Sequence, residues 1–300
     1  MTLLDEILAP SALGLAPNGV QDGPSVLKQL GLFAGLPLRR QCQVESPPYR
    51  DLRSETLHIL NADALVGYSA SLAHEVRASL DAGAFPVVIG GDCSVLLGCG
   101  LAVADEDAGL FFLDGHQDFY LPEQSPTGEA ADMDLAIVTG HASPEVQCLF
   151  GDRPLYAPEH TILFGNRDDH DVIEDNAMRL PATALLHLPL SSLGVDPLRQ
   201  ARSAIAARLG TERRFWVHLD VDVIEDADMY AVDYRLPGGL PLSQLARVLD
   251  YLMSTGRVLG MDVTIYNPRL DGADYPCGRR LVELLNTCFA RFGAEKSHRA

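Results

Sequence analysis

Phe111-Phe112-Leu113-Asp114-Gly115-His116-Gln117-Asp118-Phe119 is the segment from which the architecture of this chain can be worked out. Leu110 to Leu113 is typical of a buried strand, and three residues with metal-binding side chains follow at every second position. Alternate side chains of an extended segment point the same way, so Asp114, His116 and Asp118 are expected to converge past the strand's carboxyl end. Open α/β sheets bind their ligands there. Taken alone, the segment is equally compatible with a polar loop.

A second segment, Phe215-Trp216-Val217-His218-Leu219-Asp220-Val221-Asp222, repeats the pattern of an apolar strand that ends in polar residues. Asp220 and Asp222 stand at alternate positions and are expected on one face. Two buried carboxylates held together would repel each other, and burial would raise the pKa of at least one of them. A shared metal ion resolves that conflict.

A third turn follows a predicted strand at Phe85–Ile89 and reads Gly90-Gly91-Asp92-Cys93-Ser94. It lacks the glycine spacing and the Gly-Lys-Ser/Thr ending of phosphate-binding loops. Cys93 lies at the tip of this turn. From this turn alone, a small buried apolar residue and a metal ligand are equally good interpretations of Cys93.

Composition places the chain among globular proteins and excludes some partners. Its 300 residues are 47% hydrophobic, and 23 Lys+Arg against 41 Asp+Glu give a net charge of −18. Such acidity disfavours binding to nucleic acid or to anionic membranes, and it suits a cationic small-molecule substrate, although solubility alone also explains it. The start of the chain lacks the pattern of a signal peptide, and no apolar run reaches the ~20 residues that span a bilayer. Six scattered cysteines favour reduced thiols, and we expect a cytoplasmic protein.

Predicted strands and helices alternate along the chain, and no linker divides it. This pattern predicts one α/β domain over residues 1–300, a three-layer αβα sandwich with a mostly parallel central sheet. The first sixty residues carry little signal beyond a helix at Ser25–Leu30. The clearest further elements are helices from Asn61 and Leu242 and strands at 161–164, 182–190 and 258–263.

With these segments together, the chain resembles the ureohydrolase superfamily of arginase, agmatinase and formimidoylglutamase. The family's Asp-Ala-His-x-Asp is matched by Asp114–Asp118, its Ser-x-Asp-x-Asp by His218–Asp222, and its Gly-Gly-Asp-His-Ser by Gly90–Ser94. The resemblance extends from Gly19 to Pro268. It implies an arginase-like fold, two manganese ions at the carboxyl edge of a parallel sheet, and hydrolysis of a linear guanidinium or amidine C–N bond.

The resemblance also assigns roles to particular residues. It implies that both ions are held by Cys93, Asp114, His116, Asp118, Asp220 and Asp222. Asp220 is expected to bridge the ions, and His116 and Cys93 are each expected to complete the coordination of one ion. A hydroxide shared by the ions would attack the planar carbon, and Asp118 would accept a hydrogen bond that positions it. By family analogy the protein would be a trimer or hexamer.

Cys93 departs from the family, which usually has a neutral imidazole there. Four aspartates and a thiolate carry −5 against +4 from two divalent ions, so the bridging water should be less acidic. Sulfur also shifts metal selectivity, so Zn²⁺, Fe²⁺ or Co²⁺ are possible beside the expected Mn²⁺.

Two further departures concern the substrate. Ile265 falls where arginase-like members have a guanidinium-binding glutamate, and Ala131 falls where arginase has its proton-transfer histidine. Glu129 or His141 is expected to replace these functions, with Glu129 preferred because it lies in the matching loop. An ordinary solvated carboxylate is an equally good interpretation of Glu129.

Three polar residues after the strand at 161–164 give the remaining candidates. Arg167, Asp168 and His170 are expected either to face the substrate or to fix the loop through a salt bridge. A member of the family that retains its metals without hydrolysis, or that hydrolyses another amide-type substrate, stays an alternative.

Overall fold

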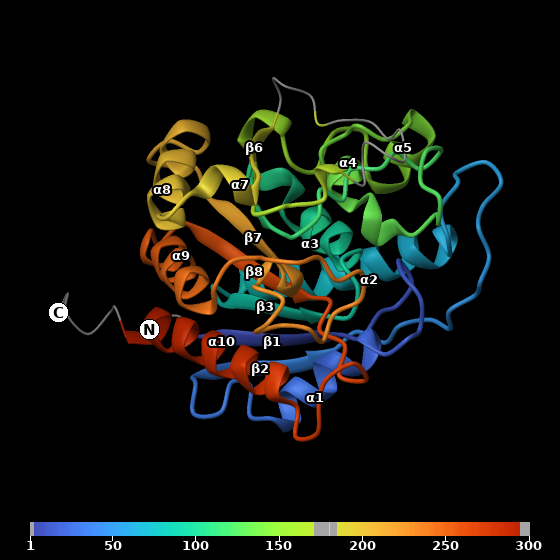
Figure 1. Cartoon of the computed structure of the whole chain (residues 1–300). Helices are drawn as coiled ribbons and strands as arrows, with labels where there is room; N and C mark the ends of the chain where they lie inside the picture. The colour runs from blue at the N-terminus through green and yellow to red at the C-terminus, as the bar shows by residue number, and fades with distance from the viewer. Residues whose placement is uncertain (1–2, 171–179, 181–184, 295–300) are drawn as a thin grey trace.

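The computed structural model describes residues 3–170, 180 and 185–294, and in this part of the chain eight strands form one sheet (Figure 1). Their order is β2-β1-β3-β8-β7-β4-β5-β6, and every strand pair is parallel. The strands are β1 (Leu4–Ala9), β2 (Leu38–Gln43), β3 (Phe85–Gly90), β4 (Gly109–Leu113), β5 (Thr161–Phe164), β6 (Leu186–Leu188), β7 (Phe215–Asp220) and β8 (Val258–Thr264).

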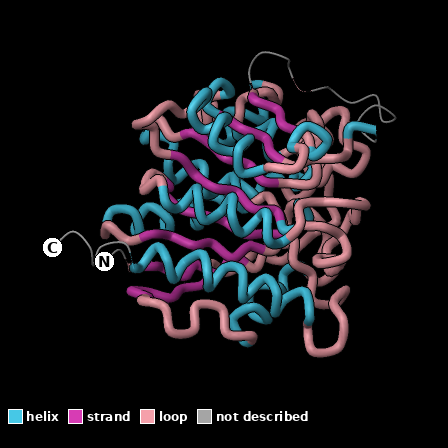
Figure 2. Tube along the Cα trace, turned by 60° about the vertical axis from the view of Figure 1, so that its left-hand side comes forward, coloured by secondary structure: helices cyan, strands magenta, loops and turns pink. Residues whose placement is uncertain are grey.

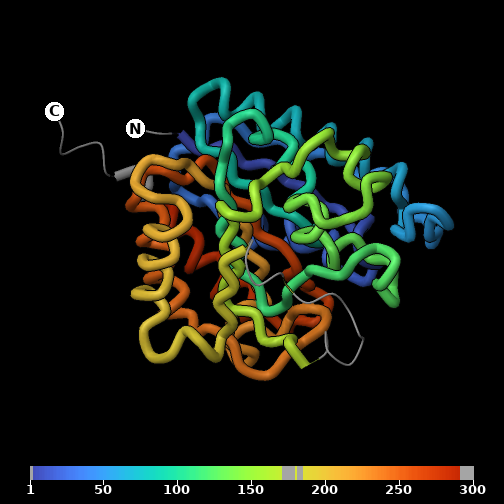
Figure 3. Tube along the Cα trace, turned by 90° about the horizontal axis from the view of Figure 1, so that it is seen from above, coloured from blue at the N-terminus to red at the C-terminus, as the bar shows by residue number. Residues whose placement is uncertain are grey.

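Helices cover both faces of this sheet (Figure 3). Each layer of helices packs on the sheet through its own apolar core. One layer contains α1 (Gly23–Gln29), α8 (Pro197–Arg208), α9 (Leu242–Ser254) and α10 (Pro276–Ala294). The other contains α2 (Ala62–Asp81), α3 (Val95–Val103), α4 (Asp134–Val138) and α5 (Pro144–Phe150). Shorter elements are α7 (Leu190–Leu193) and the 3₁₀ turns η1 (Val20–Asp22), η2 (Ala104–Glu106), η3 (Ala130–Asp132), η4 (Pro158–His160) and η5 (Val221–Val223).

The alternation of side chains along β4 shows why the central strands are apolar throughout. Phe111 and Leu113 pack into the core beneath α8, α9 and α10, whereas Leu110 and Phe112 pack into the core beneath α2 and α3. Because both faces of a parallel sheet are covered, every residue of such a strand is buried. The expected three-layer αβα fold is therefore confirmed, and the sheet is parallel throughout its described part.

Most predicted elements are found, including strands at Phe85, Leu110, Thr161, Phe215 and Val258. The strand predicted at Ala182–Leu190 is found as β6, Leu186–Leu188, and its first residues, 182–184, lie outside the described residues. That the whole chain is one domain stays a prediction.

No local sequence pattern indicates β1 or β2. In β1, Asp5 and Glu6 interrupt the apolar run, although both side chains are fully buried. Asp5 accepts a hydrogen bond from Arg39 of β2, and Glu6 pairs with Lys28 of α1 at 3.2 Å. These partners allow two charged residues inside a buried strand, and they lie too far along the chain for a local pattern to reveal them.

Long connections that follow the strands gather at one side of the molecule (Figure 2). No helix among the described residues combines the length and apolar character that crossing a membrane requires. The four central strands, β3, β8, β7 and β4, lie side by side and end at the same edge. The turns that follow them carry the candidate site.

Candidate metal centre and substrate cavity

Three segments that are far apart in the sequence meet at the carboxyl edge of the central strands. Cys93, in the turn after β3, places its Sγ 2.8 Å from Asp220 Oδ2 at the end of β7. The same sulfur lies 3.1 Å from Thr264 Oγ1 at the end of β8. Asp114 follows β4 directly, and its side chain is fully buried. The sheet topology thus brings together the turns that the sequence singled out.

Two groups of donor atoms lie beside each other here. Cys93, Asp114 and His218 form one group, and Asp114, His116 and Asp222 form the other. Within each group the donor atoms lie within 4.8 Å of one another. Asp114 belongs to both groups, so a carboxylate stands between two positions that could each hold an ion.

The alternating spacing of these motifs has a local cause. Asp114 Oδ1 accepts a hydrogen bond from the backbone N–H of His116 at 2.6 Å, and Asp220 Oδ1 accepts one from Asp222 at 2.7 Å. An aspartate that bonds the amide two residues on closes a tight turn. In both turns one carboxylate oxygen fixes the backbone, and the second oxygen is left to face the cluster.

The residues present fit divalent metal ions. Asp114 Oδ2 and His218 Nε2 are buried and have no hydrogen-bond partner among the described residues. Burial and neighbouring carboxylates raise the pKa of Asp114, Asp118 and Asp220 well above the usual range. Buried polar atoms are normally paired, and a cation would both pair these atoms and relieve the repulsion. Oxygen, imidazole nitrogen and sulfur donors together suit first-row divalent metals.

Asp222 differs from the other carboxylates because cationic groups face it. Its Oδ2 lies 2.8 Å from His116 Nδ1, and its Oδ1 accepts a hydrogen bond from Gly115 N–H at 2.8 Å. Burial acts to raise the pKa of Asp222, but His116 and Arg167 lower it to about 2. Asp222 is therefore ionised at neutral pH and available as a ligand.

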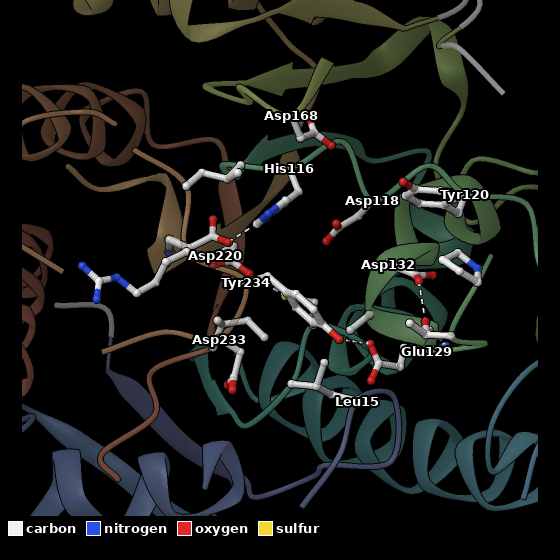
Figure 4. Close-up of a pocket in the computed structure, with 18 residues that line it drawn as sticks. Leu15, His116, Asp118, Tyr120, Glu129, Asp132, Asp168, Asp220, Asp233 and Tyr234 are labelled. Carbon is white, nitrogen blue, oxygen red and sulfur yellow. Dashed lines mark hydrogen bonds and ion pairs between the residues drawn. The ribbon is translucent and has the colours of Figure 1, made fainter. Parts of the chain in front are cut away.

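A cavity of about 340 Å³ opens above these residues (Figure 4). Figure 4 shows the side chains of His116, Asp118 and Asp220 facing the same space. The wall is strongly acidic, because it includes Asp118, Glu129, Asp132, Asp168, Asp220, Asp222 and Asp233. Arg235 also lines it, but its guanidinium is bound by both oxygens of Asp226, at 2.8 and 2.9 Å. Such a cavity favours a cationic occupant.

The loop residues predicted to act on the substrate lie at different places. Glu129 lines the cavity and accepts a hydrogen bond from the Tyr234 hydroxyl at 2.9 Å. Ala131 and Ile265 line it as well. Ile265 has φ +70°, which is rare for a β-branched residue and typical of strained functional sites. His141 lies outside the set of described residues that line the cavity: it bonds Thr139 Oγ1 at 2.9 Å.

Of the three residues predicted after β5, only Asp168 reaches the cavity wall in the described part of the chain. It accepts a hydrogen bond from Gln117 N–H at 2.9 Å. Arg167 donates to the backbone carbonyls of Asp222 and Leu236, at 2.9 and 3.1 Å, and so fixes the loop through carbonyl oxygens. His170 is exposed.

Three residues around this site received no role from the sequence: His218, Asp262 and Tyr234. His218 stands two positions before Asp220 in a strand, so the period of two already placed it on the same face. Asp262, on β8, pairs through Oδ2 with Nδ1 of His218, and this pairing depends on strand order. Tyr234 lies in a loop without periodicity, so nothing local pointed to its contact with Glu129.

Comparison with known sequences and structures shows which proteins this chain resembles. The chain matches the sequence model of the arginase family over residues 8–285. It is 26% identical over 301 residues to an arginase of Staphylococcus aureus (strain COL), covering 95% of this chain and 96% of that protein. Among solved structures, the arginase of Bacillus caldovelox has a TM-score of 0.83 at 23% identity and covers 96% of this chain and 98% of its own. The formimidoylglutamase of Bacillus subtilis has a TM-score of 0.72 at 15% identity, covering 97% and 87%.

Proposed function

The chain belongs to the arginase family, and from that premise we propose that it is a binuclear metal-dependent hydrolase of a linear, non-peptide C–N bond. The substrate class is a guanidino, amidino or formimino compound. The observation that carries the proposal is the pair of donor groups that share Asp114 at the floor of an acidic cavity. A purely structural carboxylate cluster would not need two donor groups around one shared residue, nor the unpaired buried atoms Asp114 Oδ2 and His218 Nε2.

The two ions would be held by the residues that the family motifs indicate. His116 and Asp222 would hold one ion and Cys93 the other, with Asp114 and Asp220 shared between them and Asp118 completing the set. Mn²⁺ is the expected metal, and the sulfur of Cys93 makes Zn²⁺, Fe²⁺ or Co²⁺ reasonable alternatives. When bound, such ions lower the pKa of a water molecule and stabilise negative charge that develops on the substrate.

The chain's own residues would orient the reactants. Asp118 faces the cavity from beside the cluster and would accept a hydrogen bond from the attacking water. Glu129 stands across the cavity, and burial raises its pKa, which favours the protonated form that could pass a proton to a leaving amine. Tyr234, which donates to Glu129, fixes the direction of that carboxyl group.

The cavity also limits the substrate. Its carboxylates favour a positively charged guanidinium or amidinium group over a neutral amide. Ile265 and Ala131 offer apolar contact at the two places where arginase-like enzymes have charged or polar side chains. We therefore do not assign arginine or agmatine, and a substituted guanidine or a formimino compound fits this wall as well.

The test is a panel of guanidino, formimino and amide compounds, assayed for release of ammonia or a ureide with Mn²⁺, Zn²⁺ and Fe²⁺ in turn. Turnover of a guanidino or formimino compound is expected, and Asp222→Asn should abolish it. Asp105→Asn is the matched control, because Asp105 forms an ion pair with Arg153 at the surface, and it should leave the rate unchanged. Turnover confined to neutral amides would contradict the proposed substrate class.

A second candidate function is metal binding without hydrolysis. It is favoured by Ala131 and Ile265, because neither side chain can transfer a proton or pair with a cation. The same panel separates the two functions: two ions per chain and no turnover with any metal would support this candidate and overturn the first.

We further infer a small-molecule substrate and a cytoplasmic trimer or hexamer, with no nucleic-acid or membrane partner. The acidic net charge supports a small-molecule substrate and disfavours nucleic acid and anionic membranes. The free cysteines support a cytoplasmic location, and membership of the arginase family supports the oligomer. Sedimentation of the metal-loaded protein would measure the assembly, and a monomer at micromolar concentration would contradict it.

A further inference from the structure

His218 is a buried histidine whose two ring nitrogens have different surroundings. Its side chain is fully buried in β7, and its ring stacks on Phe112 with centroids 4.4 Å apart. Nδ1 lies 2.5 Å from Asp262 Oδ2, while the indole N–H of Trp216 donates to the other oxygen of Asp262 at 2.5 Å. Both oxygens of Asp262 are thus engaged on this side of the ring, and Nδ1 is the ring nitrogen placed to donate to them.

The other nitrogen, Nε2, therefore presents a lone pair to the cluster. It has no hydrogen-bond partner among the described residues, although it is fully buried. The nearest carboxylate oxygen, Asp114 Oδ2, lies 3.9 Å away and is also without a partner. This distance is too long for a hydrogen bond. Two acceptors that face each other at such a distance need something positive between them.

The separation is close to what one shared metal ion produces. Donor atoms bound to one ion at about 2.0 to 2.3 Å lie roughly 3.3 to 3.8 Å apart in a tetrahedral arrangement. Cys93 Sγ belongs to the same group, with all three donor atoms within 4.8 Å of one another. Sulfur, imidazole nitrogen and carboxylate oxygen thus surround one point.

We propose that His218 is a metal ligand and binds, through Nε2, the ion that Cys93 and Asp114 hold. In the family motifs, the turn after β3 carries a histidine and the end of β7 carries a serine. In this chain Cys93 replaces that histidine and His218 replaces that serine, so the imidazole ligand would come from β7. The proposal rests on the proposed two-metal site and adds a ligand to it. Asp262 would then act as the carboxylate that orients a metal-binding histidine from its far nitrogen.

The competing explanation is an internal ion pair, in which a protonated His218 balances Asp114 and Asp262 without contacting a metal. The two explanations predict different responses to substitution. In His218→Asn, the amide nitrogen can still donate to Asp262, but the donor at Nε2 is lost. In His218→Gln, the longer amide can reach the position of Nε2 instead.

The experiment measures metal binding directly, with Co²⁺, Zn²⁺ and Mn²⁺ alone as probes. Wild type should bind two ions per chain by elemental analysis. In H218N, one of the two ions should bind at least about 100-fold more weakly, the upper end of what loss of a supporting contact costs. H218Q should bind that ion with intermediate affinity. His160→Asn, at the amino end of β5 and remote from the cavity, is the matched control and should bind as wild type does.

A second readout does not depend on affinity. In the Co²⁺ protein, each bound imidazole gives a paramagnetically shifted N–H proton signal, so two signals are expected from His116 and His218, and one in H218N. If neither variant at His218 folds, the number of signals in the wild type still decides. Two tightly bound ions in H218N, or a single shifted signal in the wild type, would overturn the proposal and leave the two-metal site standing. A wild type that binds fewer than two ions would overturn the proposed function as well.

Discussion

Replacing Cys93 by serine tests the proposed metal centre at the residue that departs from the family's histidine. Cys93 Sγ lies 2.8 Å from Asp220 Oδ2 and 3.1 Å from Thr264 Oγ1, and 1% of the residue is exposed. Serine would fit this space without strain because oxygen is smaller than sulfur. The substitution therefore removes the proposed ligand with little effect on packing.

The expected magnitude follows from bond lengths. A side chain that ends in oxygen reaches an ion about 0.6 Å less far than one that ends in sulfur, because both the carbon–sulfur and the metal–sulfur bonds are longer. A serine hydroxyl is also far harder to deprotonate than a thiol. We expect one of the two ions to bind at least about 100-fold more weakly, a loss of about 2.7 kcal/mol. Elemental analysis after dialysis at graded free metal would measure it.

The matched control is Cys277→Ser. Cys277 is also fully buried, but it lies on α10 and outside the described residues that line the cavity, so it tests the general effect of burying a hydroxyl. Both variants should lose similar stability in the metal-free state, and only C93S should lose an ion. Two ions per chain at wild-type affinity in C93S would refute the role of Cys93 as a ligand, whatever the enzymatic activity.

Three further predictions follow from the same region. Burial raises the pKa of Asp132 to about 7, against an unfolded value near 3.9, so its ionised form opposes folding. This penalty is absent below about pH 4 and complete above pH 7, and its upper limit is about 4 kcal/mol before screening by cavity water. In thermal melts, the Tm of Asp132→Asn should therefore rise relative to that of the wild type between pH 5 and pH 8. Removal of metal by a chelator should lower Tm by several degrees, and Mn²⁺ should restore it, since bound ions stabilise by about 2.7 kcal/mol at a hundred times Kd. Gly115→Ala should cost about 1 to 3 kcal/mol in denaturant unfolding, because the added Cβ would collide with Arg167 Nη1 and with Asp222 Oδ1. A smaller cost in an Arg167→Ala background would confirm the share of Arg167 in that clash.

The sheet could be predicted as far as its strands are uniformly apolar. β3, β4, β7 and β8 are buried on both faces, and each ends in a polar turn, so a local pattern was sufficient to find them. β1 could not be found in this way, because the ion pairs that make its Asp5 and Glu6 tolerable come from β2 and α1. Strand order is equally invisible, since β8 is the last strand in sequence yet separates β3 from β7.

The same distinction applies to the site. The spacing of two placed Asp114 with His116 and Asp220 with Asp222, because these relations are local; the structure forms each pair in a tight turn after a strand rather than along an extended segment. Contacts across the sheet could be found only from the structure. The orientation of the His218 ring, for example, depends on its contact with Asp262 on the neighbouring strand. Glu129 shows the intermediate case, because its loop was recognised from the sequence, whereas its partner Tyr234 was not.

Gly115 and Arg167 would help the proposed centre to accommodate a thiolate at Cys93. Four aspartates and a thiolate exceed the charge of two divalent ions by one. Arg167 brings a positive charge to this edge: its Nη2 donates to the backbone carbonyl of Asp222, and it helps to lower the pKa of that residue to about 2. The guanidinium and Asp222 Oδ1 together occupy the space that a Cβ at position 115 would need, where the family motif has alanine. Glycine therefore admits the arginine, and the arginine offsets the charge that cysteine adds. On this argument Arg167 serves the metals rather than the substrate, so Arg167→Ala should weaken metal binding more than it raises KM. A variant that raised KM at unchanged metal affinity would contradict it.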